Sequence, residues 1–131
     1  LSLWVGIFDS EQQKLTYVDA GHGHWAIRRA DGTSEAPPTP DGGLVGIDAN
    51  SEYKNATLEI NSGDRIILFS DGIPEQQTHT DEQYGVERVY ELIAASPTAE
   101  EDVKRLLESV IEWGGSTDLD DDTTIVSLGL I

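Results

Sequence analysis

Residues 62–72, Ser-Gly-Asp-Arg-Ile-Ile-Leu-Phe-Ser-Asp-Gly, decide how this chain is expected to fold. Four apolar residues from Ile66 to Phe69 follow one another without alternation, which is typical of a strand buried on both faces. The run stops abruptly at Asp71-Gly72, so an acid lies at the carboxyl end of the predicted strand. Such ends often carry binding groups, because the sheet holds them rigidly while they stay open to solvent. An ordinary Asp-Gly turn explains these residues equally well.

Upstream of this strand, the chain shows further strand-forming runs separated by turn residues. Asp31-Gly32 and Ser62-Gly63-Asp64 are turn sequences between such runs and predict antiparallel hairpins in a meander. The segment 35–43 is rich in proline and glycine and is predicted to be a surface loop. The expected strands are Leu3 to Phe8, Leu15 to Asp19, Trp25 to Arg29, Tyr53 to Ile60 and Arg65 to Ser70.

In the second half of the chain, the apolar residues recur at helical spacing. Val86 to Ile93 predicts one helix, with Gly85 as its N-cap. A second helix is expected to begin at Thr98, which can form a capping box with Glu101, and to end at Gly114. Both predicted helices are amphipathic. We therefore expect an α+β fold in which helices flank a sheet.

An acidic run just before the final predicted strand, Thr124 to Leu130, needs an explanation. Two carboxylates about 4 Å apart repel by about 4 kcal/mol at an effective dielectric near 20, and a bound cation would remove that cost. Mg²⁺ or Mn²⁺ suits such a site, because hard divalent ions prefer oxygen ligands. A solvated acidic turn is the alternative that these residues leave open. The acids are Asp118, Asp120, Asp121 and Asp122.

Two other motif matches fail on their remaining positions. An EF-hand loop beginning at Asp118 would need glycine and glutamate where the chain has Thr123 and Gly129. Residues 21–26 match a dinucleotide-binding fingerprint, but that motif must open a helix and a strand is predicted there.

Composition and length limit the classes of function. A net charge of −17 disfavours nucleic acid and anionic membranes as partners. The chain has no cysteine, which excludes a thiol-based phosphatase. No apolar run reaches the ~18 residues of a membrane span, and no signal peptide is evident, so we expect a cytoplasmic protein without membrane contact. We expect one partial domain over residues 1–131, cut from a longer chain, because Leu1 opens on an apolar segment.

Five segments, taken in order, resemble the PP2C-type metal-dependent serine/threonine phosphatases of the bacterial sporulation and stress-response (SpoIIE/RsbU-like) branch. The segments are Tyr17-Val-Asp-Ala-Gly-His, Leu44-Val-Gly-Ile, residues 62–75, Tyr84-Gly-Val-Glu-Arg-Val and Asp121-Asp-Thr-Thr-Ile-Val. The resemblance implies an α-β-β-α sandwich of mostly antiparallel sheets, here truncated at the N-terminus. It also implies dephosphorylation of phosphoserine or phosphothreonine by metal-activated water.

The same resemblance implies which residues form the site. Asp71 and Asp121 are expected to be catalytic through the activated water. Asp71, Gly72, Asp121 and Asp122 are expected to form the metal site, with two Mn²⁺ or Mg²⁺ ions in the complete domain, and Asp120 is only a neighbour. A further metal-binding Asp of the family belongs to an N-terminal motif that this chain lacks. The site is therefore expected to be incomplete here, and the chain alone inactive.

The resemblance also implies partners. The expected substrate is a phosphorylated regulatory protein of the anti-sigma-factor antagonist type, and a sensor or receiver domain is expected upstream in the same chain. Nucleic acid is not expected. The alternative is a non-catalytic, phosphatase-like module that binds a partner or senses a signal. The residues themselves do not identify the substrate, the activating signal or the oligomeric state.

Overall fold

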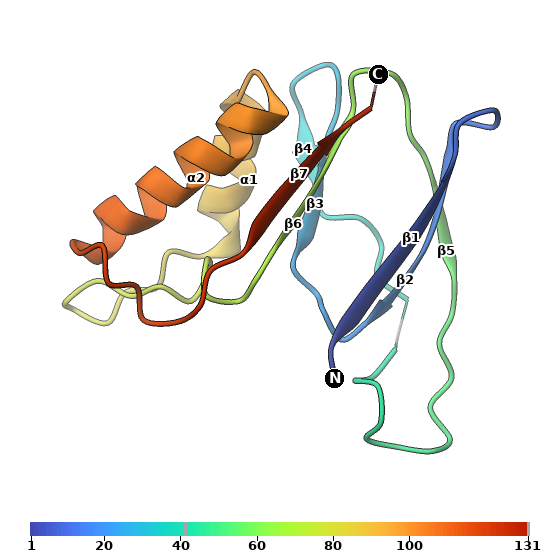
Figure 1. The fold of residues 1–131 in the computed structure, drawn as a ribbon, viewed down its shortest axis with the longest axis horizontal. Coiled ribbons are helices and arrows are strands. Elements are labelled where there is room, and N and C mark those ends of the chain that lie inside the picture. Colours follow the sequence, from blue (N-terminus) through green and yellow to red (C-terminus); the bar gives the residue numbers. More distant parts are fainter. Residues whose placement is uncertain (41, 131) are drawn as a thin grey trace. The chain divides into compact units, whose positions relative to one another are not determined.

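The computed structural model describes residues 1–40 and 42–130, and the chain divides into two compact units. The first unit comprises Leu1–Gly23 and Pro37–Asn61, and the second comprises His24–Ala36 and Ser62–Ile131. Each unit contains one antiparallel sheet, and the helices α1 and α2 belong to the second unit (Figure 1). The predicted α+β class is confirmed. The assignment of residues 1–131 to one partial domain stays a prediction.

The first unit is a three-stranded sheet in the order β1-β2-β5. Its strands are β1 Leu3–Asp9, β2 Lys14–Ala20 and β5 Ala56–Glu59. Strands β1 and β2 form a hairpin whose turn is held by the Asp9 carboxylate, which accepts the amides of Glu11 and Gln12 at 3.0 and 2.9 Å. Strand β5 is shorter than the predicted Tyr53 to Ile60, since only four residues pair with β2.

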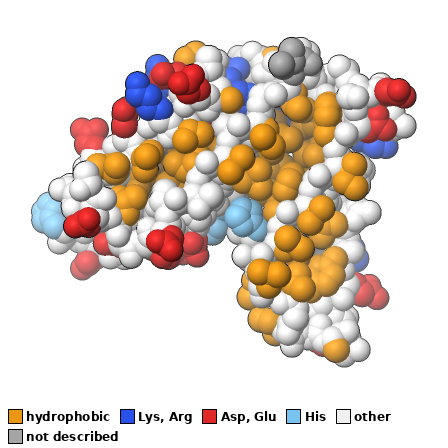
Figure 2. Space-filling view, in the orientation of Figure 1, with side chains coloured by type: hydrophobic (Ala, Val, Ile, Leu, Met, Phe, Trp, Pro, Cys, Tyr) orange, Lys and Arg blue, Asp and Glu red, His pale blue; other side chains and the backbone are white. Residues whose placement is uncertain are grey.

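Strand β1 carries an exposed apolar face at the edge of this sheet. Figure 2 shows apolar side chains gathered over β1, and the exposed ones include Leu3, Val5 and Ile7. Their alternation follows from the period of a strand, which places every second side chain on the same face. An exposed apolar edge strand favours association with other chains or segments.

The second unit contains a four-stranded sheet in the order β4-β3-β6-β7. Its strands are β4 Ser34–Glu35, β3 Trp25–Arg28, β6 Arg65–Phe69 and β7 Ile125–Gly129. Strand β6 lies between β3 and β7, and four of its five residues are buried. The prediction that this segment is a strand buried on both faces is confirmed.

The predicted meander is wrong, because the strands belong to two sheets. Asp31-Gly32 does make a hairpin between β3 and β4, with Gly32 at a positive φ of 94°. The turn at residues 62–64, in contrast, joins β5 to β6 in different sheets. Its Asp64 carboxylate accepts the Ala30 amide at 2.9 Å and an Arg29 N–H at 2.9 Å. These contacts tie the turn to the β3–β4 hairpin.

Both predicted helices are confirmed, with small differences at their ends. Helix α1 spans Val86–Ala95 and has Gly85 at its N-cap. Helix α2 spans Ala99–Gly114, and its N-cap Thr98 accepts the Glu101 amide at 3.2 Å. The predicted end at Gly114 is confirmed, and the next residue, Gly115, is the left-handed C-cap, with φ 71°. Neither helix of the described residues has the length and apolar composition of a membrane-spanning segment.

The core of the second unit lies between its helices and its sheet. Ile67 and Phe69 of β6 are buried against Val89 of α1 and Leu106 of α2, and each of these side chains is at most 1% exposed. Burial of such side chains stabilises a fold by about 1.5–3 kcal/mol each. This packing holds β6 rigidly behind the acid at its carboxyl end. The full buried cluster is Ala26, Ile67, Phe69, Ile73, Tyr84, Val89, Ile93, Leu106 and Val110.

Candidate metal-binding site

Asp71 lies where β6 ends, beside the segment that leads into β7. The β6–β7 ladder ends at the pair Phe69 and Ile125, and Ser70 extends it by one step. The Ser70 amide donates to the Thr124 carbonyl at 2.9 Å, and the Thr124 amide donates to Ser70 Oγ at 2.9 Å. Ser70 Oγ also donates to the Asp122 carbonyl at 3.1 Å. The two acidic segments thus meet at one end of neighbouring strands.

Gly72 lies close to the backbone of Asp122. A Cβ atom at this position would lie 2.7 Å from the Asp122 carbonyl oxygen, a distance that side chains do not tolerate. Only glycine therefore fits, because it has no Cβ. The residues around it form a tight turn in which the Gly72 amide donates to Asp71 Oδ1 at 3.0 Å and the Glu75 amide donates to the Asp71 carbonyl at 3.0 Å.

Asp121 and Asp122 lie in the loop between α2 and β7, and both are exposed. The Asp122 amide donates to Asp121 Oδ1 at 2.7 Å, which bends the chain at this point. An open depression of about 350 Å³ adjoins the loop. Its lining residues are Gly72, Glu75, Gln76, Gln77, Asp120 and Asp121. Asp71 is exposed at the start of the turn that provides Gly72.

Gln76 lies in the site but was not predicted from the sequence. Its side chain is 3% exposed and contacts Asp120 by hydrogen bonds in both directions, at 2.8 and 3.0 Å. No periodicity or motif distinguishes this glutamine from its exposed neighbour Gln77. Asp120, which the sequence analysis set aside as a neighbour of the acidic pair, is thereby engaged with the turn that follows Asp71.

The donor chemistry of this site fits a hard divalent cation, but the set of ligands is only partial. Carboxylate and carbonyl oxygens are the ligands that Mg²⁺ and Mn²⁺ prefer. Within residues 1–40 and 42–130, however, no three or more His, Cys, Asp or Glu side chains are grouped so that they could hold an ion. The assignments of Asp71, Gly72, Asp121 and Asp122 therefore stay predictions.

Solved PP2C-type phosphatase domains share this fold. The manganese-presoaked phosphatase domain of the cell fate determinant SpoIIE from Bacillus subtilis matches with a TM-score of 0.74 at 21% identity, over 98% of this chain and 56% of that chain. A PP2C domain from Pseudomonas aeruginosa has the same fold. Similar structures were also solved with magnesium or with two manganese ions. The chain thus has the fold of solved PP2C-type phosphatase domains, as the resemblance implied.

The chain belongs to the family of Stage II sporulation protein E (SpoIIE), whose family model matches residues 1–130. Protein IcfG of Synechocystis is 28% identical over 126 residues, which cover 95% of this chain and 20% of IcfG. Phosphoserine phosphatase RsbU of Bacillus subtilis is 25% identical over 130 residues, which cover 98% of this chain and 38% of RsbU. This chain therefore spans well under half the length of either relative.

Proposed function

We propose that this chain forms part of a PP2C-type enzyme that removes phosphate from phosphoserine or phosphothreonine in a regulatory protein. The family and the fold support the phosphatase class, and RsbU, which is named a phosphoserine phosphatase, supports the substrate residue. The observation that carries the proposal is the contact of Gly72 with the Asp122 carbonyl, where a Cβ would come within 2.7 Å. This contact brings the Asp-Gly turn and the acidic loop to one place.

In this proposal, the side chains of Asp71, Asp121 and Asp122 and the backbone carbonyl of Gly72 hold two Mn²⁺ or Mg²⁺ ions, together with ligands from outside this chain. When bound, such ions supply Lewis acidity, which activates water and offsets charge on the phosphoryl group. The protein's own contribution is to orient the oxygen donors. The Ser70–Thr124 hydrogen bonds fix the two backbones on which those donors lie.

The charge of the chain supports a need for cations at this site. With a net charge of −17, the protein repels an anionic phosphoryl group over most of its surface. Bound divalent cations would reverse the sign locally, since they are the largest local charges in such sites. We propose a substrate of the anti-sigma-factor antagonist type, and a sensor or receiver domain elsewhere in the longer chain, by analogy with RsbU and SpoIIE.

Mn²⁺-dependent release of phosphate from a phosphoserine peptide by the full-length protein tests this function. We expect Asp71→Asn and Asp121→Asn to lower the rate by at least about 100-fold, the order of magnitude lost when a main source of electrostatic stabilisation is removed. The matched control is Asp118→Asn, which also removes one negative charge and lies in the same exposed loop as Asp121. Equal rates for Asp71→Asn and Asp118→Asn would exclude the proposed site.

A non-catalytic module is the second candidate, and one observation favours it. The described residues do not gather three carboxylate or histidine side chains at one point, as a self-sufficient metal site would. A chain that binds Mn²⁺ through Asp71 and Asp121 but releases no phosphate, even within the full-length protein, would support this alternative.

A further inference from the structure

We propose that Gln76 and Asp120 form a positioning pair that aims the acidic loop, residues 118–122, at the Asp71-Gly72 turn. Asp120 then acts through its hydrogen bonds and not as a metal ligand. This inference rests on the proposed function, because it concerns how the proposed ligand Asp121 is oriented. Both residues lie in the second unit, on the loops that follow β6 and α2.

Gln76 and Asp120 are joined by one hydrogen bond in each direction. Gln76 Nε2 donates to Asp120 Oδ2 at 2.8 Å, and the Asp120 backbone amide donates to Gln76 Oε1 at 3.0 Å. The Gln77 amide also donates to Asp120 Oδ2 at 3.2 Å. Three hydrogen bonds therefore join residues that are 43 or 44 apart in the sequence. Bonds to an ionised carboxylate are among the stronger protein hydrogen bonds.

Gln76 can hold the loop because it is itself held. Its side chain is 3% exposed, and Nε2 donates a second hydrogen bond to the Gln77 carbonyl at 3.1 Å. Its backbone carbonyl accepts the Tyr84 amide at 2.9 Å. The last residue of α2, Gly114, lies so close that a Cβ there would be 2.9 Å from Nε2. The glutamine is thus fixed between the end of a helix and its own turn.

Asp121 lies between two anchors of the acidic loop. On its N-terminal side Asp120 is bound by Gln76, and on its C-terminal side the Asp122 carbonyl accepts Ser70 Oγ at 3.1 Å. The loop between these anchors has no helix or strand of its own to orient the Asp121 carboxylate. Residues that orient metal ligands typically contribute 10–100-fold to metal affinity.

The contacts of Asp120 argue against a ligand role for the same oxygen. Two N–H donors, from Gln76 and Gln77, point at Oδ2. Their partial positive charge would oppose a cation at that atom. A positioning role needs only an acceptor at this place, whereas a ligand role needs the negative charge. Asparagine at position 120 keeps the acceptor oxygen but not the charge, and alanine keeps neither. Comparing the two variants therefore separates a positioning role from a ligand role.

The test measures Mn²⁺ affinity by titration calorimetry in the full-length protein, and amide hydrogen exchange by NMR in the same protein without metal. We expect Gln76→Glu to weaken Mn²⁺ binding by about 10–100-fold, because a carboxylate would face Asp120 Oδ2 and the Gln77 carbonyl. We expect Asp120→Ala to have a similar effect. Asp120→Asn should stay within about threefold of wild type, because its side-chain oxygen still accepts both hydrogen bonds.

Gln77→Glu is the matched control, because Gln77 is the exposed neighbour and the added charge is the same. An added negative charge would by itself strengthen cation binding. Weaker Mn²⁺ binding in Gln76→Glu but not in Gln77→Glu would therefore show that the hydrogen-bond geometry has been lost. In the exchange experiment, the amides of Asp120 and Gln77 should lose protection in Gln76→Glu and keep it in Gln77→Glu. This readout does not depend on the metal.

The outcomes separate this inference from the proposed function. If wild type binds no Mn²⁺, or if Asp121→Asn binds as tightly as wild type, the proposed metal site fails and the inference fails with it. If Asp121→Asn weakens binding but Gln76→Glu does not, only the positioning pair is rejected. If Asp120→Asn weakens binding as much as Asp120→Ala, Asp120 is a ligand and the proposed division of roles is wrong.

Discussion

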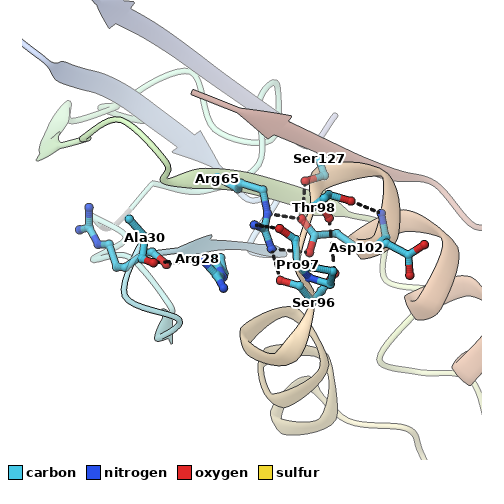
Figure 3. Close-up of polar contacts among 10 residues, drawn as sticks. Arg28, Ala30, Arg65, Ser96, Pro97, Thr98, Asp102 and Ser127 are labelled. Atoms are coloured by element: carbon cyan, nitrogen blue, oxygen red, sulfur yellow. Dashed lines mark hydrogen bonds and ion pairs between the residues drawn. The ribbon is translucent and has the colours of Figure 1, made fainter. Parts of the chain in front are cut away.

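The Arg65–Asp102 ion pair holds β6 to α2 at the end of the strand opposite the candidate site (Figure 3). Arg65 Nε and Nη2 donate to the two carboxylate oxygens of Asp102 at 2.7 and 2.9 Å, and Ser127 Oγ of β7 donates to Asp102 Oδ2 at 2.7 Å. Arg65 Nη2 also donates to the Ser96 carbonyl at 2.7 Å. The pair therefore joins two strands, a helix and the loop between the helices.

We expect Asp102→Ala to lower the free energy of unfolding by about 3–5 kcal/mol, the cost of leaving one buried charge without its partner. Asp102 is fully buried and Arg65 is 6% exposed, so water cannot replace the lost carboxylate. A loss of this size is a large fraction of the about 5–15 kcal/mol that stabilises a typical domain. The change should be measured by urea unfolding, followed by tryptophan fluorescence, because urea does not screen charges.

Two further variants keep this prediction testable if Asp102→Ala does not fold. The double variant Arg65→Met/Asp102→Leu replaces both charges with apolar groups and should lie within about 1 kcal/mol of wild type or above it. Glu101→Ala breaks the exposed pair with Arg105 and should cost about 0.3–0.5 kcal/mol. An Asp102→Ala variant no less stable than Glu101→Ala would refute the reasoning.

Three other outcomes are expected. Gly72→Ala should cost about 1–3 kcal/mol in urea unfolding, because its Cβ would clash with the Asp122 carbonyl, whereas Gly43→Ala should change little because a Cβ there meets no atom within 4 Å. Burial raises the pKa of Tyr84 above 10.0, so the unfolded chain loses that proton first and stability should fall as the pH rises through the raised pKa. Tyr84→Phe should therefore flatten the alkaline decline in urea midpoints, and an unchanged slope would contradict this. Mn²⁺ at about 100 times its Kd should raise the unfolding free energy by about 2.7 kcal/mol in wild type but not in Asp121→Asn, as differential scanning calorimetry can verify.

Local sequence signals were sufficient to predict most strands and helices of the second unit. The four successive apolar residues of β6 predicted a fully buried strand, because a run without alternation places apolar side chains on both faces of the sheet. Thr98 predicted the start of α2, since its hydroxyl satisfies an amide that the helix leaves unpaired. Asp71 was singled out because it follows a predicted strand, whereas Asp121 was chosen from the acidic run by the resemblance to PP2C-type phosphatases, and both remain predicted ligands.

Strand pairing was not predictable in the same way. Period and burial show that a segment is a strand but not which strand lies beside it. The turn at residues 62–64 has the residues of a hairpin turn, yet Asp64 binds Arg29 and Ala30 and β6 joins another sheet. The predicted meander failed for this reason.

The sequence by itself determined that a buried strand ends in Asp71-Gly72, that an acidic run precedes the last strand, and that two amphipathic helices lie between them. Only the tertiary structure decided that these ends meet. The contact of Ser70 with the Asp122 carbonyl joins residues 52 apart, and the Gln76–Asp120 pair joins residues 44 apart. Such contacts depend on the pairing of β6 with β7 and on the packing of α2. The residues around a glutamine in one loop do not indicate which aspartate of another loop it will bind.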